Sequence, residues 1–205
     1  MTKEQLIENM KRHVPDAAAT YCADWMIDHR IHFRVSKHRN TKIGDYRPPV
    51  MHQHHRISVN HNLNKYSFLI TFVHELAHLT NWKKHQRRVM PHGEEWKYEF
   101  KTHMHPFMNL DIFPGDINNA LLVYMSNPSA THCADKNLFR VLKRYDEDSL
   151  HLLLETLPQG CLFKIKGYNN VFEKGACIRK NFLCTDTATK RQYRVSPLAE
   201  VEVVG

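Results

Sequence analysis

The chain has 205 residues, of which 42% are hydrophobic and 24% are charged, and its formal net charge is +8 at pH 7. This composition allows one ordinary folded domain, alone or with a small appendage, and it excludes a disordered or low-complexity protein. No run of 18 apolar residues occurs, so we expect no membrane span and no membrane partner.

The cysteines and the N-terminal residues indicate the compartment. The five cysteines form no closely spaced pair, which argues against a disulfide framework and fits a reducing environment. The first 14 residues, MTKEQLIENMKRHV, are polar and contain no apolar core of a signal peptide. We expect a cytoplasmic protein and a monomer.

Helical and extended patterns alternate in the first 60 residues. Residues 3–13 and 17–29 predict two helices. Residues 31–35 and 56–60 alternate apolar and polar side chains, as strands with one buried face do, and Tyr46 begins a short extended piece between them. These strands are expected to form a small antiparallel sheet.

Residues 65–82 predict a long helix without Pro or Gly, which Asn62 or Asn64 can cap. Its apolar residues recur at spacings of three and four, as on a helix face that packs in a core. They are Leu69, Phe72, Val73, Leu76 and Leu79.

This helix carries the motif HELAH, an HExxH, at residues 74–78. Side chains four residues apart share a helix face, so His74 and His78 can place two imidazoles on one metal ion. Zinc accepts neutral His nitrogens and keeps one position open in catalytic sites. The adjacent Glu75 can take a proton from a metal-bound water. Because the chain contains 16 His, a chance motif is a real alternative, and a third ligand is needed.

The expected third ligand is His92, which stands between a Pro and a Gly at the start of a helix that runs to about residue 103. Glu95 and Glu99 are alternatives, because zinc also accepts carboxylates. The sequence predicts one Zn²⁺ ion, and its expected ligands are His74, His78 and His92.

The motif HELAH followed by PHGEEWK resembles the SprT-like metalloprotease family, which pairs HExxH with a later HGxxF/W segment. The resemblance covers about residues 5–110. It implies an α+β fold with a zincin-like core, in which two helices and a short sheet precede the active helix. It also implies that His74, His78 and His92 bind zinc and that Glu75 is the catalytic base of an endopeptidase. Some members digest proteins crosslinked to DNA and are activated by DNA.

The segment Pro158-Gln159-Gly160 predicts a boundary between a metalloprotease domain, residues 1–157, and a small β-rich unit, residues 158–205. Before the boundary we expect a loop, a helix, and then mixed helix and loop, at residues 106–115, 116–125 and 136–157. After it we expect short strands at residues 161–166, 171–173, 175–183, 192–195 and 201–204.

The cysteines after residue 130 bear on a second metal site. Many SprT-like proteins end in a zinc ribbon with paired cysteines, but this chain contains no CxxC. Small core residues are the favoured interpretation of these cysteines, and a second zinc site is the alternative. The cysteines concerned are Cys133, Cys161, Cys177 and Cys184.

Basic residues gather in three stretches, near residues 30–42, 83–88 and 179–194. A basic surface can contact nucleic acid through phosphates, and solvated surface charge is the alternative. The expected contacts of a DNA partner are Arg34, Lys37, Lys83, Lys84, Arg87 and Arg88.

Three further features carry weaker expectations. The group His52, His54 and His55 can form a second metal site or a polar loop. The strand at residues 56–60 can hold a peptide substrate by β-addition. Candidates for stabilising the oxyanion, chosen by position alone, are Tyr98, His103 and His105.

The sequence therefore predicts a zinc-dependent metallopeptidase that hydrolyses peptide bonds with a Glu-activated, zinc-bound water. Its protein substrates would include DNA-bound or DNA-crosslinked proteins. One alternative is a DNA-binding module with structural zinc, and another is a zinc hydrolase for small substrates. Loss of proteolysis in Glu75→Gln, with zinc content retained, would separate the peptidase from the DNA-binding module.

Overall fold

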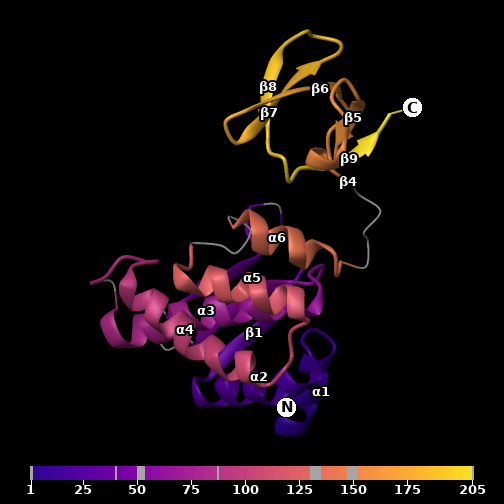
Figure 1. Cartoon of the computed structure of the whole chain (residues 1–205). Helices are drawn as coiled ribbons and strands as arrows, with labels where there is room; N and C mark the ends of the chain where they lie inside the picture. The colour runs from indigo at the N-terminus through magenta and orange to yellow at the C-terminus, as the bar shows by residue number, and fades with distance from the viewer. Residues whose placement is uncertain are drawn as a thin grey trace. The chain divides into compact units, whose positions relative to one another are not determined.

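The computed structural model describes residues 2–39, 41–49, 54–86, 88–129, 135–146 and 152–204. The chain divides into two compact units, Met1–Asp146 and Glu147–Gly205 (Figure 1). Among the described residues there are six α-helices and two sheets, which confirms the expected α+β class. No helix within these ranges is both long enough and apolar enough to cross a membrane.

The first unit combines one sheet with six helices. Its strands are β1 (Ile31–Ser36), β2 (Gly44–Arg47) and β3 (His55–Asn60). Its helices are α1 (Lys3–Lys11), α2 (Asp16–Asp28), α3 (Lys65–His85), α4 (Glu94–Asn109), α5 (Gly115–Ser126) and α6 (Lys136–Lys143).

The sheet of the first unit is mixed, so the expectation of an antiparallel sheet is wrong in part. β3 is the central strand and pairs antiparallel with β2 and parallel with β1. An alternating pattern fixes which side chains are buried but not the direction of the strand. Parallel neighbours need a long crossover connection, and the chain between β1 and β3, which contains β2, supplies it.

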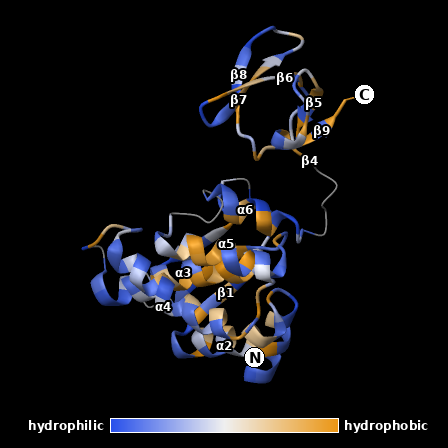
Figure 2. Cartoon of the chain, in the orientation of Figure 1, coloured by the Kyte–Doolittle hydropathy of each residue, from blue (hydrophilic) through white to orange (hydrophobic). Residues whose placement is uncertain are grey.

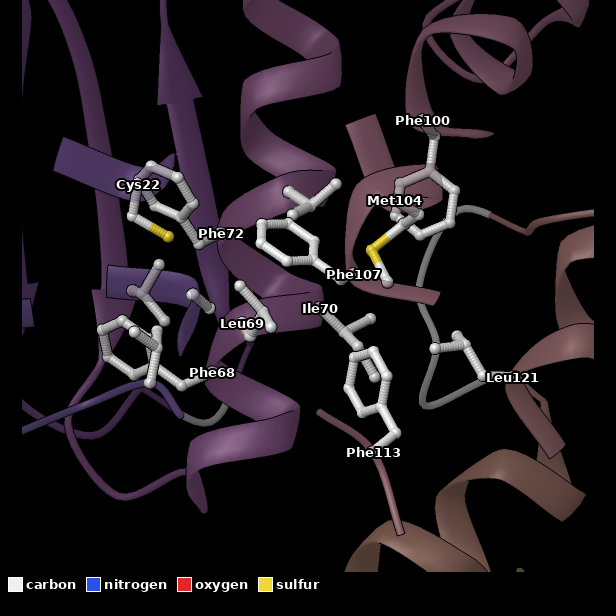
Figure 3. Packing of buried hydrophobic residues seen from close by; sticks show 14 of the residues in the cluster. Cys22, Phe68, Leu69, Ile70, Phe72, Phe100, Met104, Phe107, Phe113 and Leu121 are labelled. Carbon is white, nitrogen blue, oxygen red and sulfur yellow. The ribbon is translucent and has the colours of Figure 1, made fainter. Parts of the chain in front are cut away.

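Helix α3 is the centre of the first unit. Fourteen of its 21 residues are buried, so other elements pack around most of the helix and not against one apolar face alone. Figure 3 shows Cys22 and Phe68 on the strand side of α3, and Phe100 and Met104 of α4 on its other side. Figure 2 shows the hydrophobic residues gathered on α3 and α5. Burial of each such side chain stabilises the fold by about 1.5–3 kcal/mol.

Two helices are longer than expected. α3 continues to His85, so Lys83 and Lys84 lie on its last turn and not in a loop. α4 continues through Pro106 to Asn109, where a loop had been expected. Proline removes one helical hydrogen bond, but the fully buried Phe107 anchors this last turn in the core.

The second unit is one antiparallel sheet with strand order β4-β9-β5-β6-β7-β8. One 3-10 helix, η2 (Leu154–Thr156), follows β4. The strands are β4 (Leu152–Leu153), β5 (Leu162–Ile165), β6 (Val171–Ile178), β7 (Asn181–Asp186), β8 (Gln192–Val195) and β9 (Glu200–Val203).

One turn and one boundary differ from those expected. The expected strand at residues 175–183 is interrupted at Arg179, whose φ of 58° begins the turn between β6 and β7. The second unit also reaches back before residue 158, because β4 pairs with β9 and Leu154 and Leu157 join its core. The buried Lys174 donates hydrogen bonds to the carbonyls of Glu155 and Leu157, which fixes η2 on the sheet.

Candidate metal centre

Three imidazoles meet at one point in the first unit. His74 Nε2 lies 3.1 Å from His78 Nε2 and 3.4 Å from His92 Nε2. His74 is buried, and the other two are half-buried. Among the described residues, these three form the only group of His, Cys, Asp or Glu whose ligand atoms lie close enough together to hold a metal ion.

The spacing of the nitrogens fits a tetrahedral metal ion. Zinc–nitrogen bonds of about 2.0–2.1 Å at tetrahedral angles place the nitrogens about 3.3–3.4 Å apart. The two Nε2 separations fall close to this value. The three histidines could therefore hold one ion through Nε2, provided that each keeps its proton on Nδ1.

Local structure explains how the ligands converge. His74 and His78 are one turn apart on α3, whose N-cap, Asn64, accepts hydrogen bonds from the N–H groups of Tyr66 and Ser67. His92 lies in the turn before α4, which returns the chain to α3. The N–H of the next residue, Gly93, donates to the carbonyl of Met90 at 3.1 Å in that turn.

Trp96 forms a wall of the site, a role that sequence reasoning missed. Its fully buried ring lies 4.6 Å from the ring of His74, 5.4 Å from that of His78 and 4.9 Å from that of His92, measured between centroids. It stacks in turn on Phe100 at 5.3 Å. The sequence indicated this position, since Trp96 lies on the first turn of α4, directly after the turn that holds His92.

His78 and His92 are in the protonation state that binds metal. Burial, assisted by the neighbouring His92, lowers the pKa of His78 to about 3, and burial also lowers the pKa of His92. Their imidazoles are therefore neutral at pH 7, and neutral nitrogen is the form that ligates.

Glu75 follows His74 on α3 and lies in a closely packed position against β2. Its side chain is buried, and it accepts a hydrogen bond from the backbone N–H of Tyr46. Burial, followed by the charge of Asp45, raises the pKa of Glu75 to about 8. A Cβ added to Gly44 would lie 2.3 Å from Glu75 Oε1, so only glycine allows β2 to approach this closely.

The alternative third ligands lie elsewhere. Glu99 is buried on α4 and pairs with Lys84. Although burial opposes ionisation, the hydrogen bonds from Lys84 and Thr80 lower the pKa of Glu99 below its usual value. The carboxylate of Glu95 lies near Gly93 and is not part of the three-histidine group. The expectation that His92 completes the set therefore fits the geometry.

The other proposed metal ligands do not form a second site in the described part of the chain. Cys161, Cys177 and Cys184 are free thiols and belong to no metal-binding group there. His52 and Cys133 lie outside the described residues.

The three candidates for oxyanion stabilisation are not gathered at the histidines. His103 packs against Trp25, and its Nε2 lies 3.1 Å from Thr80 Oγ1. Burial lowers the pKa of His103 to about 4, so it is neutral at pH 7. Tyr98 is 65% exposed, and His105 is exposed as well.

The expected nucleic-acid contacts lie at separate places. Arg34 and Lys37 are exposed on and just after β1, whereas Lys83 and Lys84 lie on the last turn of α3. Lys83 donates to His29 Nδ1, and Lys84 pairs with Glu99. Arg88 is exposed in the turn after α3, and Arg87 lies outside the described residues.

The structure adds basic residues to the neighbourhood of Arg34. Strand register places His32, Arg56 and Arg47 side by side across the three strands, on the same face as Arg34. Arg39 crosses this face and donates to Ser58 and Asn60. We call the group His32, Arg34, Arg39, Arg47 and Arg56 the basic sheet face. Sequence reasoning missed Arg47 and Arg56, because only the register shows that they join this face.

No protein-family model, no curated protein and no solved structure matches this chain. The resemblance carried by HELAH and PHGEEWK therefore stays a prediction, and the geometry of the three histidines, Glu75 and β2 is what indicates a function.

Proposed function

We propose that this chain is a zinc-dependent endopeptidase of SprT-like type with a zincin-like core. The observation that carries the proposal is the convergence of three Nε2 atoms at tetrahedral spacing, two of them from the helix that also carries the buried Glu75. Three histidines leave one position of a four-coordinate ion open, as in catalytic sites, whereas structural zinc sites use four protein ligands. The open fourth position favours an enzyme over a module with structural zinc.

In the mechanism, a bound zinc ion supplies Lewis acidity and lowers the pKa of water towards neutrality. The positive charge of a bound zinc ion would also favour the ionised form of Glu75. The Glu75 carboxylate then takes a proton from the attacking water and passes it to the leaving amine. The N–H of Tyr46 holds the Glu75 carboxylate in position for this transfer. Trp96 fixes the orientation of the three imidazoles by packing against their rings.

The substrate peptide pairs with β2 in this proposal, and not with β3 as the sequence suggested. β3 has a neighbour on both sides, so it offers no free edge. β2 is an edge strand, and its Tyr46 N–H points to Glu75, so the free edge faces the proposed catalytic carboxylate. An extended peptide can add to such an edge by backbone hydrogen bonds.

The test is cleavage of casein by zinc-loaded protein together with metal analysis. We expect about one zinc ion per chain in the wild type. Glu75→Gln should lower cleavage by at least about 10²-fold, the usual contribution of a general base, and should retain the zinc. Cleavage by this variant at the wild-type rate would refute the mechanism. If casein and histone both stay intact but small amide substrates are hydrolysed, the protein is a hydrolase of small molecules.

We also propose that the enzyme binds DNA, so that its substrates include DNA-bound proteins. The basic sheet face supports this, because it carries four arginines, and Asp45 is the acid that faces them. Arg34 and Arg47 are the exposed arginines of this face. Phosphate oxygens are suitable acceptors for their guanidinium groups.

DNA binding is tested by the affinity for single-stranded DNA at several salt concentrations. Arg34→Glu should weaken binding and reduce the salt dependence, because a phosphate contact is lost. Arg12→Glu, at an exposed position outside the three basic stretches, is the matched control. Equal affinity of both variants and the wild type would exclude the basic sheet face as the DNA site.

A further inference from the structure

A polar pocket of about 290 Å³ lies at the end of β2 that is farther from Gly44. It is formed by the C-terminal end of α2, the chain that leads into β3 and the last turn of α3. Two fixed positive charges and three imidazoles line it, against one carboxylate. Its polar lining residues are Asp28, His29, Arg30, His54, His55 and Lys83.

The donors in this pocket are available to an anion. Among the described residues, Lys83 and Arg30 form no ion pair. Lys83 Nζ donates to His29 Nδ1 at 3.0 Å. An ammonium group has no acceptor, so His29 must carry its own proton on Nε2 and offer a second donor. The negative charge of Asp28 offsets only one of the two positive charges, so the pocket carries a net positive charge.

Contacts through Tyr46 connect the pocket to the proposed catalytic carboxylate. The backbone N–H of Tyr46 donates to Glu75, and its hydroxyl lies 2.9 Å from His55 Nδ1 in the pocket wall. His55 also packs edge-on against Trp82 at 5.4 Å. Trp82 is one helical turn after His78, on the face of α3 that carries the ligands. The pocket wall therefore contacts the face of α3 that carries His74 and His78.

Strand direction determines which part of a substrate would reach the pocket. β2 runs from Gly44, which contacts Glu75, towards Arg47 at the pocket end. A peptide antiparallel to β2 runs the opposite way, so its N-terminal part lies at the pocket. Lys83 is five residues after His78 on α3, about 7.5 Å along the helix axis. At about 3.3 Å per extended residue, this places the pocket roughly two to four residues before the scissile bond.

We propose that this pocket is a specificity site for an acidic side chain, Asp or Glu, on the N-terminal side of the scissile bond. The inference rests on the proposed endopeptidase activity. A carboxylate would receive charge-assisted hydrogen bonds from Lys83, Arg30 and His29. An uncharged amide of the same shape would leave those cations without a counter-charge.

The experiment first maps the bonds that the zinc-loaded full-length enzyme cuts in casein. A quenched peptide that spans a rapidly cut bond is then made with Glu or Gln at each of the four positions before that bond. At one position we expect kcat/KM to be about tenfold higher for Glu than for Gln. Lys83→Met should reduce that ratio to about one, and Lys83→Arg should restore most of it. Lys190→Met, an exposed lysine of the second unit, should keep the full ratio.

The same peptides are tested for binding to the Glu75→Gln protein by calorimetry, which needs no hydrolysis. Cleavage of both peptides at equal rates would refute the role of the pocket in specificity, and so would a preference for Glu that persists in Lys83→Met. Neither result would refute the endopeptidase activity. If casein is not cleaved at all, the endopeptidase fails, and calorimetry with casein-derived peptides that carry Glu or Gln at one position alone decides the pocket. Equal affinities of the Glu and Gln peptides in that case overturn it.

Discussion

Gly44 is a single residue on which the geometry of the candidate site depends. An added Cβ would lie 2.3 Å from Glu75 Oε1 and 2.7 Å from Thr71 Cγ2, both too close for real atoms. Gly44→Ala should therefore displace either β2 or the Glu75 carboxylate. A misplacement of about 1 Å can cost about 10²-fold in rate, so we expect a loss of about that size in kcat/KM on casein.

The control for this variant is Gly115→Ala, since a Cβ there meets nothing within 4 Å. That variant should keep wild-type activity. Zinc content should stay at the wild-type value in both variants, because neither residue contacts the three histidines. If Gly44→Ala retains full activity, the close approach of β2 to Glu75 has no catalytic importance.

The raised pKa of Glu75 also determines how the stability of the metal-free protein should depend on pH. The folded pKa of about 8 lies above the usual value of 4.5, so folding favours the protonated form. The stabilisation is complete below pH 4.5 and is lost as the pH rises through 8. His78 has the opposite effect, because its lowered pKa costs stability as the pH falls below 6.5. Above pH 6.5 the effect of Glu75 remains alone.

Between pH 6.5 and 8, the free energy of unfolding of the metal-free first unit should therefore fall by about 2 kcal/mol. Glu75→Gln has no charge to lose and should show a flat profile over this range. Urea titrations after chelation, at several pH values, measure both. A slope in Glu75→Gln that equals the wild-type slope would assign the effect to another group.

Among the elements, α3 depends on its N-cap residue, Asn64. Asn64 caps the helix through Oδ1, and its Nδ2 donates to the carbonyl of Leu142 at 2.9 Å and to Asp146 Oδ1 at 2.6 Å. Asn64→Ala should lose both functions and cost about 2–3 kcal/mol of the free energy of unfolding, measured by urea titration.

Asn64→Asp separates the two functions of this residue. It keeps an oxygen for the cap but has no donor for Leu142, and it places a second carboxylate beside Asp146. We expect it to be destabilised as well. A stability equal to that of the wild type would show that the link to the end of α6 contributes nothing.

Much of the element structure could be predicted from the sequence, and the misses have physical causes. The helix at residue 65 and its Asn64 cap follow from periodicity and local hydrogen bonding, which act within a few residues. The continuation of α4 through Pro106 depends on the burial of Phe107 in a core made by distant segments. The parallel pairing of β1 with β3 likewise depends on tertiary packing, which an alternating sequence pattern does not determine.

At the candidate site too, the local geometry could be predicted from the sequence and the contacts between distant segments could not. His74, Glu75 and His78 are separated by fixed helical steps, so their mutual geometry could be predicted from spacing alone. The role of Tyr46 depends on how β2 approaches α3, and the pocket around Lys83 draws residues from three distant segments. No local pattern reports such contacts.

For the whole molecule, the two units should respond differently to metal removal. All three histidines belong to the first unit, and the second unit has a core of its own. Zinc at 100 times its dissociation constant should stabilise the first unit by about 2.7 kcal/mol. In calorimetry of the full chain, a chelator should shift one unfolding transition to lower temperature and leave the other in place. Equal shifts of both transitions would mean that the units unfold together.

The fluorescence of Trp96 should report whether a metal ion is bound between the three histidines. Its indole is one of three in the chain, and its centroid lies within 5.4 Å of all three imidazole rings. An absorbing ion such as Co²⁺, bound between those imidazoles, would quench the emission of Trp96 much more than that of an indole farther away. Metal exchange could then be timed on the intact protein without any substrate, and Trp96→Phe would identify the part of the signal that comes from the centre itself.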